Sequence, residues 1–173
     1  MEILVHPNPA LASPACEVDP QTDSSLRPLA EKMARMMYEA PGIGLAATQI
    51  GVMKRFIVYD LSEDGEGLSA LCNPVIIEMS DECLVEEEGC LSLPGINVPV
   101  PRACKVTCEG LSLDGKRVRI EAEGLEARMF QHEIDHLDGM LIIDRAEPEE
   151  RKAALRRYRE ALEKGARPGE TSI

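Results

Sequence analysis

The chain has 173 residues, about the size of one ordinary domain, and 44% of them are hydrophobic, so it can bury a core without disulfide staples. A formal net charge of −12 argues against a nucleic-acid-binding surface over the whole molecule, and so against DNA as a partner. The same charge favours a monomer whose copies repel one another. The sequence shows neither a basic segment leading into an apolar run nor a stretch that could span a bilayer. We therefore expect a cytoplasmic protein with no membrane partner and with six reduced cysteines.

The first half of the chain predicts one helix followed by short strands. Apolar residues recur at helical spacing from Ser24 to Ala40, and Pro28 falls in the first turn, where a proline is tolerated. A glycine-rich segment from Gly42 to Gly51 follows, and the acidic stretch from Ser62 to Ser69 predicts a loop. The strands expected here are Arg55 to Asp60, Leu71 to Glu78 and Asp81 to Val85.

The second half predicts a hairpin and two further helices. Their expected ranges are Lys105 to Ser112, Lys116 to Ala122, Leu125 to Leu137 and Pro148 to Lys164. Asp114-Gly115 is typical of a type I′ turn between the two strands, and Gly139 is suited to end the middle helix. The residues from Arg167 to Gly169 are expected to fray.

Together these elements predict an α+β fold, with short, mostly antiparallel strands around a central helix and with an N-terminal and a C-terminal helix. No repeat, low-complexity tract or linker divides the chain. Residues 1–173 should therefore form a single domain, with its core at 1–146 and a charged C-terminal helix and frayed tail at 147–173.

The pattern His132-Glu133-Ile134-Asp135-His136 lies on the expected central helix. Residues i and i+4 are about 6 Å apart along a helix and about 40° apart around it, so both imidazoles can bind one metal ion. Glu133 can then exchange protons with a metal-bound water. The alternative is a solvated helix with two histidines by chance. Two of the three histidines fall here, and Leu125 and Met129 precede them on the same face, which favours a site beside an apolar surface.

A catalytic metal site needs a third protein ligand, and the sequence offers two sources. Upstream, Cys90 lies in Glu88-Gly89-Cys90-Leu91-Ser92, which has the character of an irregular turn after a strand. Taken alone, such a cysteine is more often a buried thiol. Downstream, one of three glutamates could be the third metal ligand, as in a zincin-type metallopeptidase, although these glutamates lie at the start of a charged helix. They are Glu147, Glu149 and Glu150.

The segment from Gly42 to Gln49 is the third candidate. Its glycines permit close approach of a ligand to the backbone, and Gln49 offers an amide donor. It lacks the patterns of a phosphate-binding loop, and by itself it is a weak signal whose default interpretation is a tight turn before a strand.

Taken in order, these three segments resemble the signature motifs of the peptide deformylase family. The motifs read Gly42 to Gln49, Glu88 to Ser92 and Gln131 to Gly139, and the resemblance covers essentially residues 1–145. It implies an enzyme that hydrolyses the N-formyl group from the N-terminal formyl-methionine of nascent polypeptides and releases formate. A zincin-type metallopeptidase and a non-catalytic peptide-binding relative are the alternatives.

The resemblance also implies roles for individual residues. Cys90, His132 and His136 would bind one divalent transition metal. Fe(II) is the ion we expect first, and Zn(II), Ni(II) and Co(II) are the alternatives. Glu133 would act as general base, and the Gln49 amide and the Leu91 backbone N–H would stabilise the oxyanion. The implied substrate-binding residues are Ile43, Gly44, Gly89, Leu125 and Met129.

The C-terminal segment differs in charge from the rest of the chain. Seven basic and six acidic side chains between Glu147 and Ile173 give it a net charge of +1, which leaves −13 for residues 1–146. Lys152, Arg156 and Arg159 recur at helical spacing and form a basic ridge. Such a ridge is usually only a solvated face, but it also suits contact with ribosomal RNA where the substrate emerges.

Overall fold

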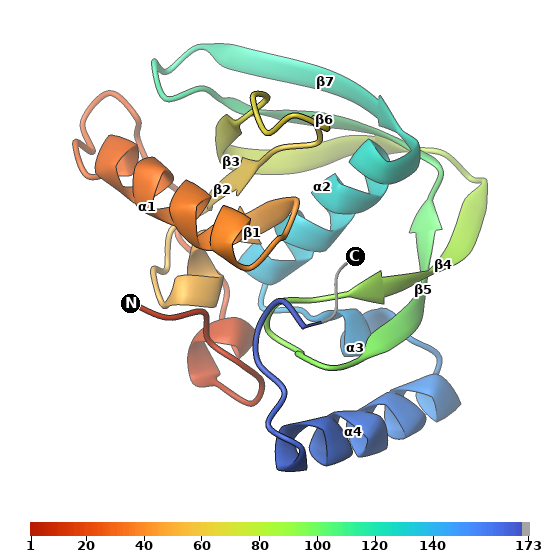
Figure 1. Ribbon diagram of the computed structural model, residues 1–173. Coiled ribbons are helices and arrows are strands. Elements are labelled where there is room, and N and C mark those ends of the chain that lie inside the picture. Colours follow the sequence, from red (N-terminus) through yellow and green to blue (C-terminus); the bar gives the residue numbers. More distant parts are fainter. Residues whose placement is uncertain (171–173) are drawn as a thin grey trace.

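The computed structural model describes residues 1–170, and it confirms the expected α+β class (Figure 1). The elements in chain order are the 3-10 helix η1 (Pro9–Ala12), α1 (Leu26–Glu39), β1 (Gly44–Ala46), the 3-10 helix η2 (Ala47–Ile50), β2 (Phe56–Tyr59), β3 (Ser69–Met79), β4 (Cys83–Gly89), β5 (Asn97–Ala103), β6 (Lys105–Leu111), β7 (Arg117–Glu123), α2 (Gly124–Leu137), α3 (Ile142–Arg145) and α4 (Pro148–Glu163). Of the described helices, none is long and apolar enough to cross a membrane.

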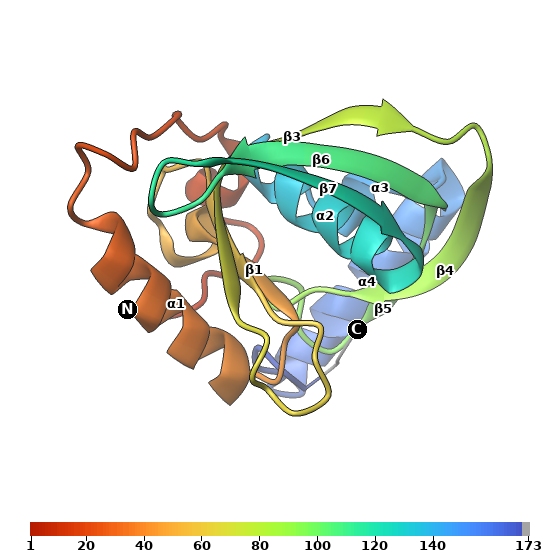
Figure 2. The same ribbon diagram turned by 90° about the horizontal axis from the view of Figure 1, so that it is seen from above.

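The strands form two antiparallel sheets with α2 between them. The larger sheet has the order β1-β2-β3-β6-β7, and β4 and β5 form a separate ribbon. Seen from above, α2 runs beneath β6 and β7 with the β4–β5 ribbon beyond it (Figure 2). All residues from Ala127 to Leu137 are buried. A helix buried on every side is normally apolar, so its buried polar residues indicate a functional site.

The other helices cover the outer surfaces. Met33 and Met37 of α1 pack on Phe56 and its neighbours in β2, as the helical periodicity predicts. At the opposite end, α3 and α4 pack on β5. Tyr158 of α4 is buried, and its hydroxyl donates to the His6 carbonyl at 2.6 Å. The C-terminal helix is therefore part of a core cluster and not only a solvated appendage.

Strand β5 was not expected from the sequence. Pro99 and Pro101 argue against a strand because proline cannot donate a ladder hydrogen bond. Within residues 1–170, β5 pairs with β4 alone, so one edge of β5 carries no ladder that its prolines could break. β5 also packs against α3 and α4. β4 also extends to Gly89, beyond the expected end at Val85.

Two local expectations need correction. The 105–123 hairpin is present, but Gly115 N–H donates to the Ser112 carbonyl, and Asp114 does not have the positive φ that a type I′ turn requires. The glycine-rich segment contains a short strand, β1. In the tail that is expected to fray, Gly169 lies against the Ala40 backbone. Residues 171–173 of that tail lie outside the described part of the chain.

Candidate metal centre

Three buried side chains converge between α2 and the end of β4. Cys90 follows β4 directly, and His132 and His136 project from α2; their ligand atoms all lie within 4.8 Å of one another. Cys90 Sγ is 3.5 Å from His136 Nε2. A thiolate at about 2.3 Å and an imidazole at about 2.1 Å from one tetrahedral ion would be about 3.6 Å apart. The donor set therefore fits a single ion, and its sulfur and nitrogen atoms favour a transition metal over magnesium or calcium.

The downstream glutamates do not join this centre. Glu147, Glu149 and Glu150 are exposed around the start of α4. Within residues 1–170, the group of side chains that could hold a metal consists of the cysteine and the two histidines alone. The geometry thus favours the upstream ligand, Cys90.

Glu88 orients one of the histidines. Its Oε1 lies 2.8 Å from His132 Nδ1, and its side chain is fully buried. Burial alone would raise the pKa of Glu88, but hydrogen bonds from His132 and Arg102 outweigh burial and hold the pKa far below its ordinary value. An ionised carboxylate can only accept, so Nδ1 donates and Nε2 keeps its lone pair for a metal.

A buried ion-pair network holds Glu88 in turn. Arg102 of β5 makes two bonds to Glu88, at 2.9 and 3.0 Å, and a third to Asp135 at 2.6 Å. Arg128 of α2 also donates to Glu88 and to the Val100 carbonyl. Because every charge in this network has a partner, the network can remain buried and fix the position of His132.

Glu133 lies on the opposite side of the centre, against β1. Its side chain is buried, and its Oε2 has no hydrogen-bond partner among the described residues. A Cβ added to Gly44 would lie 2.8 Å from Glu133 Oε1, so the strand approaches the carboxylate closely. Burial raises the pKa of Glu133 to about 7, and a base with such a pKa can accept and return protons near neutral pH.

Gln49 reaches the centre from η2. Its Oε1 accepts the Ala46 backbone N–H at 3.0 Å, while its Nε2 lies 3.9 Å from Cys90 Sγ. Leu91 follows Cys90 directly in the chain. The structure therefore brings the Gln49 amide, one of the two expected oxyanion donors, next to Cys90.

The structure places only some of the expected substrate-binding residues close to one another. Met129 is buried in the same cluster as the half-buried Ile43. Leu125 is 54% exposed at the start of α2 and lies at the rim. Gly44 lies on β1, an edge strand of the larger sheet, and Gly89 ends β4, an edge strand of the ribbon, so an extended peptide could pair with either edge.

The buried network is the part of the site that sequence reasoning missed. Glu88 lies inside a recognised motif, but nothing in the sequence pairs it with Arg102, 14 residues away, or with Arg128, 40 residues away. The only available signal was a charged residue, Arg128, between apolar positions on the central helix. Ser92, which contacts Gln49, was likewise given no role.

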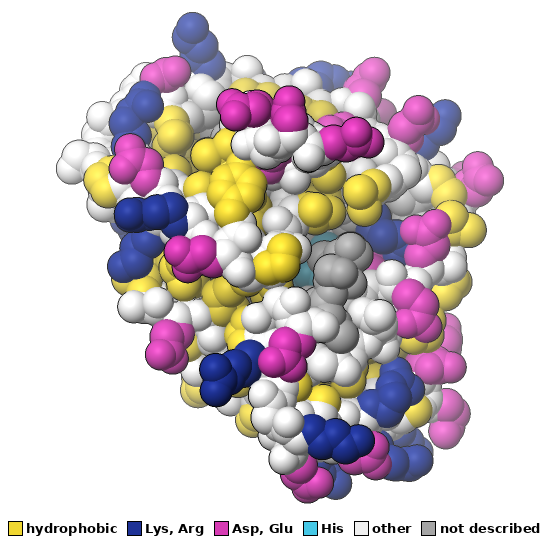
Figure 3. All heavy atoms as spheres, in the orientation of Figure 1, with side chains coloured by type: hydrophobic (Ala, Val, Ile, Leu, Met, Phe, Trp, Pro, Cys, Tyr) yellow, Lys and Arg dark blue, Asp and Glu magenta, His cyan; other side chains and the backbone are white. Residues whose placement is uncertain are grey.

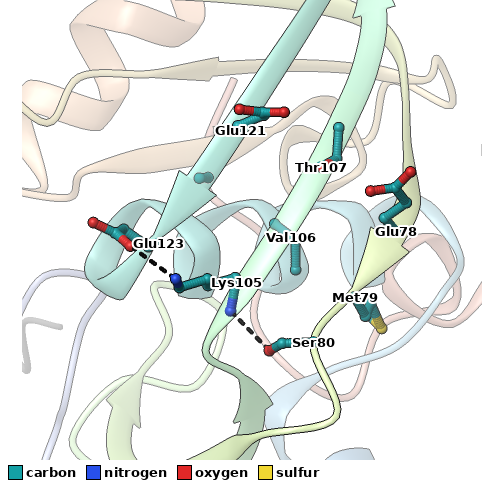
Figure 4. Close-up of a pocket in the computed structure, with 9 residues that line it drawn as sticks. Glu78, Met79, Ser80, Lys105, Val106, Thr107, Glu121 and Glu123 are labelled. Atoms are coloured by element: carbon teal, nitrogen blue, oxygen red, sulfur yellow. Dashed lines mark hydrogen bonds and ion pairs between the residues drawn. The ribbon is translucent and has the colours of Figure 1, made fainter.

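The surface around the centre is mixed in character. Figure 3 shows a histidine side chain near the middle of the drawn face, with hydrophobic side chains beside it and most charged side chains farther out. A cavity of about 550 Å³ lies elsewhere, over β3, β6 and β7 (Figure 4). There Lys105 pairs with Glu123 at 3.8 Å, and Glu78 and Glu121 flank Thr107. This cavity contains none of the expected site residues.

Comparison with known proteins gives consistent matches. The family model described as "Polypeptide deformylase" matches residues 1–152. A "Peptide deformylase" of Halothermothrix orenii is 53% identical over 138 residues, which covers 80% of this chain and 88% of that protein. One of Rhizobium meliloti is 43% identical over 161 residues, with 92% of each chain covered. A crystal structure of a peptide deformylase from Legionella pneumophila superposes with a TM-score of 0.87 at 40% identity and covers 94% of this chain and 95% of that one.

Proposed function

The chain belongs to the polypeptide deformylase family, and from this premise we propose that its Cys90–His132–His136 centre is the active site. The reaction is hydrolysis of the N-formyl group from the N-terminal formyl-methionine of nascent polypeptides, which releases formate and a free amine. The observation that carries the assignment of the site is the spacing of the three donor atoms, within 4.8 Å of one another in a buried position.

The three donors would hold one divalent transition metal, with Fe(II) as our first choice and Zn(II), Ni(II) or Co(II) as alternatives. When bound, such an ion acts as a Lewis acid towards water and the formyl carbonyl. The chain's own contribution is to orient the ligands: the Glu88 carboxylate holds His132 with its Nε2 towards the centre.

Glu133 would move the protons. Its carboxylate accepts a proton from the attacking water as the new C–O bond forms, and it returns that proton to the peptide nitrogen as the C–N bond breaks. A pKa of about 7 suits both transfers. Because Oε2 makes no hydrogen bond to a side chain or backbone group within residues 1–170, the protein itself does not compete with the attacking water for it.

Gln49 and Leu91 would stabilise the negative charge that develops on the formyl oxygen. The Gln49 amide lies beside Cys90, and Leu91 follows Cys90 directly in the chain. Each pre-organised donor of this kind contributes about 3 kcal/mol to the transition state.

The peptide would bind as an added strand between Gly44 on the edge of β1 and Gly89 at the end of β4. Its methionine side chain would then contact the apolar group of Ile43, Met129 and, at the rim, Leu125. An unbranched apolar side chain suits this surface because it offers no partner for a charge.

Because the substrate is a nascent polypeptide, the proposed function also implies where the enzyme acts and what it meets there. We place the activity in the cytoplasm, in a monomer that meets its substrate at the ribosome. The basic ridge of Lys152, Arg156 and Arg159 supports that contact, since all three side chains are exposed on α4.

The test is formate release from formyl-Met-Ala-Ser, measured with and without a chelator. Activity that resists complete metal removal would contradict the assignment. The variant Cys90→Ala distinguishes a deformylase centre from that of a zincin-type metallopeptidase. We expect the variant to lose its stoichiometric metal. If the third ligand were instead a downstream glutamate, the variant would still bind the metal.

A further inference from the structure

We infer that Ser92 is a positioning residue, which holds the Gln49 side-chain amide in one rotation at the metal centre, while the Ala46 N–H sets which end of the amide faces that centre. Ser92 Oγ lies 3.1 Å from Gln49 Nε2, and both side chains are buried. The inference rests on the oxyanion role proposed above for Gln49, and it assigns to Ser92 a function that acts only through that amide.

An amide has a donor end and an acceptor end of nearly the same shape, so its orientation must be specified by its neighbours. At one end, Gln49 Oε1 accepts the Ala46 N–H at 3.0 Å. At the other, Nε2 donates one of its two N–H groups to Ser92 Oγ. The second N–H remains for Cys90 Sγ, 3.9 Å away, and for a developing oxyanion. A flipped amide would lose the Ala46 bond and would bring its oxygen towards the thiolate.

The backbone around this pair is also held together. Gln49 belongs to η2 and Ser92 to the turn after β4, 43 residues away. The Leu4 N–H donates to the Gln49 carbonyl at 2.7 Å, and the His6 N–H donates to the Ser92 carbonyl at 2.9 Å. The N-terminal segment thus ties the two backbones together, so the Ser92 hydroxyl is a fixed reference point for the amide.

Removing the Ser92 hydroxyl would leave a buried N–H without its acceptor and an amide anchored at one end only. Such an amide samples other rotations, and the oxyanion donor is then out of place for part of the time. We expect Ser92→Ala to lower kcat by roughly tenfold, a fraction of the 100- to 1000-fold typical when an oxyanion donor is deleted outright. KM should change less than about twofold, because the interaction strengthens only in the transition state.

The decisive experiment is a double-mutant cycle with Ser92→Ala and Gln49→Leu, measured as kcat for formyl-Met-Ala-Ser. If Ser92 acts through Gln49, Ser92→Ala costs about tenfold in the native background but less than about twofold when Leu replaces Gln49. An equal loss in both backgrounds would overturn the inference, because Ser92 would then act by some other route.

The single variants keep this inference separate from the proposed function. A loss of kcat with Gln49→Leu but none with Ser92→Ala would overturn the positioning role and leave the oxyanion role of Gln49 intact. Full kcat with Gln49→Leu would overturn that oxyanion role itself, and the positioning role with it.

Four controls exclude a structural effect. Metal content and the unfolding midpoint of Ser92→Ala should match the parent within error. The visible absorption spectrum of the Co(II)-substituted protein should also be unchanged, because the ligand set is intact. Ser80→Ala removes a hydroxyl that accepts the Lys105 N–H at 3.0 Å where the end of β3 meets the start of β6, and its kcat should not change. A shifted Co(II) spectrum in Ser92→Ala would count against positioning and indicate a disturbed metal centre.

Discussion

Gly44 and Glu133 are in direct contact beside the Cys90–His132–His136 centre: a Cβ on Gly44 would lie 2.8 Å from Glu133 Oε1 and 3.1 Å from its Cδ. The backbone of Gly44 does not have a positive φ, so the need for glycine here is steric and not conformational. The edge of β1 leaves room for the Glu133 carboxylate, which is the general base in the proposed mechanism, and in that mechanism it also supplies the backbone that pairs with substrate.

Replacing Gly44 with alanine should therefore displace the Glu133 carboxylate. We expect kcat to fall by at least about tenfold, since a misplacement near 1 Å can cost far more, while bound metal stays stoichiometric. Gly42→Ala is the matched control. Its added methyl would meet only the tip of Leu91 at 3.0 Å, which can move, so its kcat should fall much less. Equal losses in the two variants would contradict the steric account.

Glu133→Ala should separate proton transfer from metal binding. Because Glu133 is not among the three donors, the variant should keep its metal, as elemental analysis would show. Its kcat should fall by at least about a hundredfold. Glu121→Ala, an exposed glutamate on β7, provides the control for loss of one negative charge. Near-normal turnover without Glu133 would rule out its role as general base.

Glu88→Gln should weaken both the metal site and the fold. Loss of the carboxylate that orients His132 is expected to lower metal affinity by about 10- to 100-fold, measured by chelator competition. Breaking its buried pairs should lower the free energy of unfolding by about 3–5 kcal/mol. Glu86→Gln is the matched control, because Glu86 pairs with the same Arg128 but is 54% exposed, and its effect should stay below about 1 kcal/mol. Unaltered metal affinity in Glu88→Gln would refute the orienting role.

The substrate side chain should be selected by the apolar surface near Met129. Formyl-Met and formyl-norleucine peptides should be turned over well. Formyl-Asp and formyl-Lys peptides should have a much lower kcat/KM, because a buried charge would find no partner. N-acetyl-Met peptides should also react poorly, since the extra methyl crowds the metal centre. Similar rates across this series would show that the side chain binds elsewhere.

Ribosome contact is best tested without deleting α4, because its Tyr158 is buried against His6. Reversing Lys152, Arg156 and Arg159 to glutamate changes only exposed side chains. We expect this variant to co-sediment with ribosomes less at low salt, while its turnover of short peptides is unchanged. The control variant replaces three exposed basic residues around β7 with glutamate, so that the net charge changes by the same amount. These residues are Lys116, Arg117 and Arg119. Equal weakening by both variants would indicate a general charge effect and not a docking helix.

The sequence by itself determined the features that depend on neighbouring residues. The helical spacing of His132 and His136 puts both imidazoles on one side of α2 whatever surrounds the helix. The apolar periodicity placed α1 within two residues of its observed bounds. The order of the three motifs indicated the family, and the family model and relatives then showed it.

Only the tertiary structure decided which distant residues meet. β5 was missed because its prolines are tolerated only at an unpaired strand edge, and which edges are unpaired follows from the tertiary fold. Glu88 of β4 meets Arg102 of β5 and Arg128 of α2, and no local pattern encodes either contact. Backbone geometry fixes relations between residues a few positions apart. Relations across strands and helices follow from register and burial, and these exist only once the chain has folded.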